Sequence, residues 1–119
     1  LAMKVTLFHN PRCSKSRETL QLLLDQGIKP EIIEYLKTPP SFSQLEEILV
    51  KLNLQPRQLM RTKEPEYAQL GLNDESLSCE DLINAMINTP KLLERPIVLA
   101  NDKAAIGRPP EAVLAILTS

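Results

Sequence analysis

The residues with the clearest chemical potential lie around a cysteine near the start of the chain. Cys13 follows the first predicted strand and directly precedes a predicted helix. The segment around it reads His9-Asn10-Pro11-Arg12-Cys13-Ser14-Lys15-Ser16-Arg17. The free N–H groups and the dipole at a helix N-terminus stabilise negative charge, and the three basic residues add to that effect. We therefore expect the pKa of the Cys13 thiol to fall into the range of about 3.5–7.5 seen at such sites.

The same loop is suited to an anion. Free N–H groups after Cys13 converge on one spot, as in other oxyanion sites at helix N-termini. Ser16 stands where a C-x-x-C motif would have its second cysteine, so no local disulfide can form. The pattern predicts a nucleophilic thiolate without a neighbouring resolving thiol. The alternatives are a structural cysteine in a basic loop, and solvated surface charges at Arg12, Lys15 and Arg17.

Three further arginines stand at the edges of predicted elements. Arg61 follows a short helical turn, Arg95 precedes a strand, and Arg108 lies in a turn before the last helix. The planar guanidinium binds two oxygens of an oxyanion at once. Each arginine taken singly is more often a surface residue, and spacing alone does not decide whether they converge on Cys13.

Local patterns predict the elements that carry these residues. The chain opens with a strand over 5–8, a helix from Ser14 that stops at Gly27, and a strand over 31–36. Such a β-α-β unit is normally parallel and right-handed. The chain closes with strands over 96–100 and 103–106, joined by a two-residue hairpin turn at Asn101-Asp102, and with a helix opening at Pro110.

The stretch between these two parts is mostly helical. Ser43 with Glu46, and Ser78 with Asp81, have the spacing of helix N-terminal caps, and Pro65 can open a further helix. The order β-α-β, helical block, β-β-α predicts a thioredoxin-like α/β fold with a mixed sheet. We expect one domain over 3–119, with a helical insertion over about 41–90.

Composition excludes several classes of protein. The chain has 119 residues, with 14 Lys and Arg against 15 Asp and Glu, so it lacks the basic excess of a general nucleic-acid binder. No apolar run approaches the ~18 residues of a membrane span, and no signal peptide is expected. No metal-ligand spacing and no G-x-G-x-x-G motif occur. With no long exposed apolar stripe, a monomer is expected.

Two cysteines, Cys13 and Cys79, are too few for a disulfide scaffold, which favours a reducing cytoplasm. Cys79 begins a predicted helix, one residue after its cap. It is interpreted as a bystander, and the alternative is a distant resolving thiol.

Taken together, these residues resemble a known family. The chain is similar to the glutaredoxin-coupled arsenate reductases of the thioredoxin-like superfamily from Val5 to Leu117. The matching segments are His9–Arg17, Glu34-Tyr35-Leu36, Leu59-Met60-Arg61, Gln69-Leu70-Gly71-Leu72, Glu94-Arg95-Pro96-Ile97-Val98 and Gly107-Arg108-Pro109. Basic residues at 12 and 15, and a short segment after the last helix, make it most similar to the chromosomal arsenate-reductase-like branch.

The resemblance implies roles for particular residues. Cys13 would be the nucleophile, with His9 and Ser16 tuning its thiolate. The oxyanion would be bound by the arginines of the family motifs and by the basic loop, namely Arg61, Arg95, Arg108, Arg12 and Lys15. Pro96 would be preceded by a cis peptide bond. Arsenate would be the substrate, glutathione the reducing co-substrate and glutaredoxin the protein partner, with no bound cofactor.

Two other functions stay open. One is a glutathione-dependent thiol oxidoreductase with another substrate. The other is a non-enzymatic regulator that binds a protein partner through the helical block, as some relatives with this fold bind RNA polymerase. Those regulators usually carry a C-x-x-C redox switch, which this chain lacks, and would not need Arg61, Arg95 and Arg108.

Overall fold

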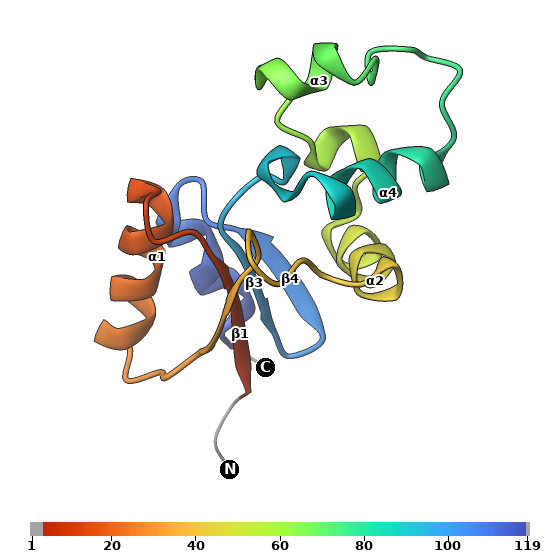
Figure 1. The fold of residues 1–119 in the computed structure, drawn as a ribbon. Helices are drawn as coiled ribbons and strands as arrows, with labels where there is room; N and C mark the ends of the chain where they lie inside the picture. Colours follow the sequence, from red (N-terminus) through yellow and green to blue (C-terminus); the bar gives the residue numbers. More distant parts are fainter. Residues whose placement is uncertain (1–3, 119) are drawn as a thin grey trace. The chain divides into compact units, whose positions relative to one another are not determined.

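A computed structural model describes residues 4–118, so residues 3 and 119, the ends of the predicted domain, lie outside the described part. The chain divides into two compact units (Figure 1). The first combines the segment up to Thr38 with the segment from Arg95 onward. The second is Pro39–Glu94, and the predicted helical insertion falls inside it.

The first unit is built on a four-stranded mixed sheet. Its strands are β1 (Val5–His9), β2 (Glu31–Glu34), β3 (Ile97–Ala100) and β4 (Lys103–Ile106), in the order β2-β1-β3-β4. The β1–β2 pair is parallel, whereas β1–β3 and β3–β4 are antiparallel. The predicted mixed sheet is therefore confirmed. The long-range β1–β3 pairing brings the beginning and the end of the chain together.

Two helical segments of this unit contact each other beside the sheet. They are α1 (Ser14–Asp25), which connects β1 to β2, and the 3₁₀ helix η3 (Pro110–Ile116). Alternate strand residues point to the same side, and those on this side form the core with the helices. The buried cluster comprises Val5, Leu7, Leu23, Val98, Ala100, Val113 and Ile116.

The structure corrects three predictions for the first unit, two of them strand boundaries and one a helix type. β2 ends at Glu34 rather than at residue 36, because the N–H groups of Lys37 and Thr38 both donate to the Glu34 carbonyl and close a turn. β3 begins at Ile97, after Pro96, which has no N–H to donate to a sheet. The last helix does open at Pro110, but it is a 3₁₀ helix.

The second unit consists of helices. These are α2 (Phe42–Leu52), the 3₁₀ turn η1 (Pro56–Leu59), α3 (Pro65–Gln69), α4 (Cys79–Asn88) and the 3₁₀ turn η2 (Pro90–Leu92). α4 contacts α2, η1 and η2 and so is central to this unit. The buried apolar residues of the second unit are Leu45, Ile48, Leu49, Leu59, Met60, Leu72, Leu82, Ile83, Met86, Leu92 and Leu93.

The caps of α2 and α4 show one correction and one confirmation. α2 is capped by Ser41 and Gln44, not by the predicted Ser43 and Glu46. The Ser41 hydroxyl accepts from the Gln44 N–H at 3.2 Å, and the Gln44 side chain accepts from the Ser41 N–H at 2.9 Å. The helix therefore starts two residues earlier. The predicted cap of α4 by Ser78 and Asp81 is confirmed.

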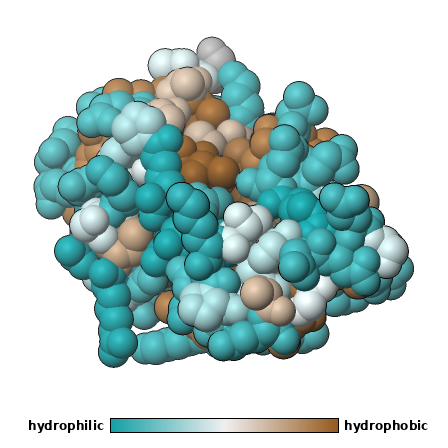
Figure 2. Space-filling view, turned by 90° about the horizontal axis from the view of Figure 1, so that it is seen from above, coloured by the Kyte–Doolittle hydropathy of each residue, from teal (hydrophilic) through white to brown (hydrophobic). Residues whose placement is uncertain are grey.

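The surface in view in Figure 2 is mostly hydrophilic, with apolar residues in smaller patches. Over residues 4–118, no helix combines the length and the apolar character needed to cross a lipid bilayer. In the same range, no group of three or more His, Cys, Asp or Glu side chains is arranged to hold a metal ion.

Candidate active site

Cys13 is the N-cap residue of α1. Its backbone is extended (φ −93°, ψ 125°), and its carbonyl accepts the first helical hydrogen bond, from the Arg17 N–H at 3.0 Å. Its own N–H donates to the Asn10 carbonyl at 3.0 Å, which closes the turn between β1 and α1. The sulfur therefore lies where the free N–H groups of the first helical turn point.

Asn10 organises this turn. Its side-chain oxygen accepts from the Arg12 N–H at 3.1 Å, and its own N–H donates to the Ser16 hydroxyl at 3.0 Å. The residue is 7% exposed. Sequence reasoning included Asn10 only as part of the Cys13 segment and missed this role. A buried asparagine that bonds to the chain on both sides of Cys13 holds the loop in one shape.

His9 and Ser16 form a buried pair beneath the loop. His9 Nδ1 and Ser16 Oγ share a hydrogen bond of 2.7 Å. Because residues alternate along β1, His9 shares the side of Val5 and Leu7 that packs against α1. Burial lowers the pKa of His9; Glu34 opposes that shift and Arg17 adds to it. A neutral imidazole is thus held against Ser16. The Ser16 hydroxyl in turn accepts from the Asn10 N–H, which belongs to the Cys13 turn.

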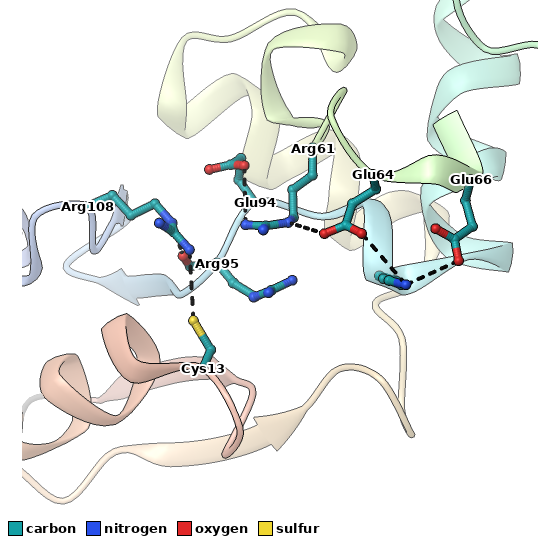
Figure 3. A network of polar contacts seen from close by, with 8 residues as sticks. Cys13, Arg61, Glu64, Glu66, Glu94, Arg95 and Arg108 are labelled. Atoms are coloured by element: carbon teal, nitrogen blue, oxygen red, sulfur yellow. Dashed lines mark hydrogen bonds and ion pairs between the residues drawn. The ribbon is translucent and has the colours of Figure 1, made fainter. Parts of the chain in front are cut away.

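Arg95 and Arg108 reach the cysteine from the other end of the chain. In Figure 3 both side chains lie on the side to which the Cys13 sulfur points. Arg108 Nη2 lies 3.8 Å from Cys13 Sγ, and Arg108 Nε donates to the Arg95 carbonyl at 2.7 Å. Arg95 immediately precedes β3 and Arg108 follows β4, so the hairpin brings both to Cys13.

These neighbours change the acidity of the thiol. Burial alone would raise the pKa of Cys13, but the Arg95 guanidinium, acting by hydrogen bonding and by charge, and the N–H groups of Ser16 and Lys15 together lower it below its usual value. The direction agrees with the expectation from the sequence. The side chain that lowers the pKa is Arg95, whereas Lys15 acts through its backbone.

The basic side chains of the loop itself have other contacts. Lys15 Nζ lies 3.6 Å from the Glu18 carboxylate, and Arg17 donates to the Pro11 carbonyl at 3.0 Å. Arg12 is exposed. The positive charge that the sequence places around Cys13 is therefore spread over the outside of the loop, and the guanidinium groups at the sulfur come from distant segments.

Close packing holds the Arg95 and Arg108 segments in place. The Arg95–Pro96 peptide bond is cis, as the resemblance implies, and the Arg108–Pro109 bond is cis as well. The Gly107 N–H donates to the Pro96 carbonyl at 2.9 Å. A Cβ at Gly107 would lie 2.8 Å from the Pro96 ring and would also overlap Thr19 of α1. Only glycine fits here, a requirement that sequence reasoning missed.

Arg61 belongs to the second unit. Its N–H donates to the Leu92 carbonyl, and Met60 pairs with Leu93, so its segment runs beside Glu94. Arg61 Nε lies 3.2 Å from Glu64, and Arg61 Nη1 lies 3.7 Å from Glu94. Lys91 extends this cluster to Glu64 and Glu66 (Figure 3). Two carboxylates thus contact the guanidinium of Arg61.

The fold and the site define a class: a thioredoxin-like α/β protein with a single low-pKa cysteine at the start of its first helix. The ArsC family model matches residues 8–116, and the chain belongs to that family. Arsenate reductase of Neisseria meningitidis is 50% identical over 115 residues, 96% of this chain and 98% of that one. The Escherichia coli K12 protein YfgD, described as uncharacterized, is 54% identical over 98% of this chain and 99% of its own.

A solved structure agrees with the sequence comparisons. Arsenate reductase from Vibrio cholerae superimposes with a TM-score of 0.96 at 52% identity, covering 98% of this chain and all of that one. The thioredoxin-like fold class predicted from the order of elements is thereby confirmed, and so is the resemblance to the arsenate reductases.

Proposed function

We propose that this protein reduces arsenate to arsenite with glutathione as reductant and glutaredoxin as the recycling partner. The observation that carries the proposal is the placement of Arg95 and Arg108 at the sulfur of Cys13. An anion drawn to these two guanidinium groups meets the thiolate that the same groups stabilise. The arsenate reductases of Neisseria meningitidis and Vibrio cholerae, each about half identical to this chain, support arsenate as that anion.

In the first step, the Cys13 thiolate attacks the arsenic atom of arsenate. A sulfur–arsenic bond forms and an oxygen leaves as water once it has taken up protons. Both reactants are negative, so they repel each other in water. Arg95 and Arg108 offset that repulsion in the ground state and the charge of the oxyanion in the transition state. Arsenic stays in the +5 state.

In the second step, a glutathione thiolate attacks the Cys13 sulfur. A disulfide forms between Cys13 and glutathione, the sulfur–arsenic bond breaks, and its electron pair stays on arsenic, which leaves as arsenite in the +3 state. Ser16 cannot act as a resolving thiol, so an external thiol is required. A glutaredoxin thiol then takes the glutathione and regenerates the Cys13 thiolate.

Further residues have supporting roles in this proposal. Asn10, His9 and Ser16 keep the loop in the shape that exposes the N–H groups of the first turn. Arg12, Lys15 and Arg61 are kept as the further oxyanion ligands that the resemblance implies, although carboxylates partly offset the charges of Lys15 and Arg61. Both cysteines are free thiols, and we place the reaction in the reducing cytoplasm.

A coupled assay tests the proposal. Arsenate, glutathione, glutaredoxin, glutathione reductase and NADPH are combined with the wild type, Cys13→Ser and Cys79→Ser. We expect arsenate-dependent NADPH oxidation in the wild type and in Cys79→Ser, and none above background in Cys13→Ser. Cys79 is the matched control, because it is the only other cysteine and is exposed.

Two changes of reagent separate the rival functions. Replacing glutaredoxin and glutathione with thioredoxin and thioredoxin reductase should abolish turnover. If thioredoxin supports the reaction equally well, the proposed reductant is wrong. If, without arsenate and without glutaredoxin, this protein raises the rate of NADPH oxidation by a small disulfide above the rate in its absence, it is a general thiol oxidoreductase.

A further inference from the structure

Tyr35 lies next to the active-site loop. In the parallel β1–β2 pair, His9 is in register with Glu34, so Asn10 and Tyr35 each follow the last paired residue of their strand. Asn10 and Tyr35 therefore lie next to each other, just beyond the ends of β1 and β2. Tyr35 is 1% exposed, and its hydroxyl has no hydrogen-bond partner among the described residues. A buried, unpaired hydroxyl is costly, so its presence calls for an explanation such as a function.

Arg95 has a matching unpaired atom. Its guanidinium contacts Cys13, yet its Nε–H is buried and has no hydrogen-bond partner among residues 4–118. Nε–H is a donor and a phenol oxygen is an acceptor. The two unpaired groups are therefore complementary.

The electrostatics show that these two side chains are neighbours. Burial raises the pKa of Tyr35, while Arg95 and Asn10 partly oppose that rise and the Cys13 thiolate adds to it. The hydroxyl therefore stays neutral at physiological pH. A neutral phenol can accept a hydrogen bond from the guanidinium without cancelling its charge, as a carboxylate would.

We propose that Tyr35 is a positioning residue of this active site, whose hydroxyl accepts a hydrogen bond from Arg95 Nε–H and holds the guanidinium against the Cys13 sulfur. Tyr35 and Arg95 interact in the free protein, so a small rotation of the guanidinium is enough to close this contact without an oxyanion. Nε is then used on the tyrosine, and the two Nη groups remain for the sulfur and the oxyanion. The proposal rests on the proposed function only in taking Cys13 as the nucleophile.

The thiol itself provides the test. All variants carry Cys79→Ser, so that only Cys13 reacts, and the rate of alkylation by iodoacetamide is measured against pH. Tyr35→Phe keeps the ring and removes the hydroxyl. We expect it to raise the pKa of Cys13 by roughly 0.3–1 unit, which corresponds to the loss of one ordinary hydrogen bond. The matched control is Tyr67→Phe, because Tyr67 is the only other tyrosine and bonds to Arg57 in the second unit.

A double-mutant cycle shows whether Tyr35 acts through Arg95. In an Arg95→Ala background, Tyr35→Phe should leave the thiol pKa unchanged. The proposal is overturned if Tyr35→Phe titrates like the wild type, or if its shift persists without Arg95. Melting curves by circular dichroism accompany each variant. Because Tyr35→Phe keeps the buried ring, it should melt close to the wild-type temperature, which shows that the variant is folded.

Arsenate protection separates this proposal from the proposed function. The arsenate concentration that halves the alkylation rate should rise roughly 3- to 10-fold in Tyr35→Phe. If arsenate does not slow alkylation of the wild type, arsenate is not the substrate. The pKa comparison, made without arsenate, still decides the role of Tyr35.

Discussion

Two arginine clusters of this protein differ in what surrounds the guanidinium. In the first unit, Arg95 contacts the Cys13 thiol and lies near the neutral Tyr35 hydroxyl. In the second unit, Arg61 lies against the carboxylates of Glu64 and Glu94. Both arginines occur in the motifs that suggested the family, and both are drawn in Figure 3.

The surroundings decide how much charge is left for a ligand. A carboxylate that contacts a guanidinium occupies its donors and cancels its field. A neutral phenol occupies one donor without cancelling the field of the guanidinium, and a thiol cancels the field only once it ionises. Arg95 therefore has its charge available to the nucleophile and the oxyanion, whereas much of the charge of Arg61 is already used within its own unit. Two arginines that both belong to family motifs therefore need not contribute equally to binding of the oxyanion.

The largest expected effect is that of Arg95→Ala. We expect kcat/KM for arsenate to fall roughly 100-fold, the typical loss when one donor to a developing anion is removed. The thiol pKa should rise in the same variant, because Arg95 is the side chain that lowers it. Lys103→Ala, which removes an exposed charge of the same unit, is the control. A loss below 5-fold in steady-state kinetics would contradict the assigned role.

Gly107→Ala should disturb the first cluster through packing. The new Cβ would collide with Thr19 and Pro96, so we expect the free energy of unfolding to fall by about 1–3 kcal/mol in urea denaturation. Gly27→Ala is the comparison. It has open space but a φ of +76°, so strain alone should cost about 1 kcal/mol. Wild-type stability in Gly107→Ala would show that the segment shifts freely.

Arg61→Ala should cost less activity than Arg95→Ala. We expect kcat/KM for arsenate to fall roughly 3- to 10-fold, because the two carboxylates already offset its charge. Glu64→Gln removes one of them and should move KM for arsenate in the opposite direction. If Arg61→Ala loses as much as Arg95→Ala in the coupled assay, the contrast between the two clusters is wrong.

The smallest effect concerns His9 and pH. Burial lowers the pKa of His9 from 6.5, so the unfolded state binds more protons than the folded state just below pH 6.5. Stability should therefore fall as the pH drops through 6.5 and below. His9 is the only histidine, so His9→Gln should flatten this part of the profile. Urea denaturation at pH 7.5, 6.5 and 5.5 measures the difference between the two proteins.

Much of the first unit could be predicted from local patterns. The strand over 5–8, the helix from Ser14 and the Asn101-Asp102 hairpin depend on nearby residues. Both turn residues indeed have positive φ, 53° and 60°, as a two-residue turn of this kind requires. The start of α2 was predicted two residues too late, because Ser41 and Ser43 each have a suitable partner three residues on and only packing selects one.

The site was less predictable than the fold. The sequence indicated Cys13 and named Arg95 and Arg108 as candidates, but only the β1–β3 pairing shows how they reach the sulfur. The roles of Asn10 and Gly107 depend on hydrogen bonds and on free space that no spacing rule records. The contact of Arg61 with Glu64 is local, but its contact with Glu94 depends on the pairing of Met60 with Leu93, which the sequence does not show.

The distance along the chain between Cys13 and Arg108 has a consequence for folding. The two residues are 95 positions apart, and the antiparallel β1–β3 pairing must close that loop before they can meet. Closing a long loop costs entropy that later contacts recover, so such pairings form late and slowly. The rate at which Cys13 reacts with a thiol reagent at neutral pH therefore reports on refolding. This rate should rise only when the two ends of the chain have paired.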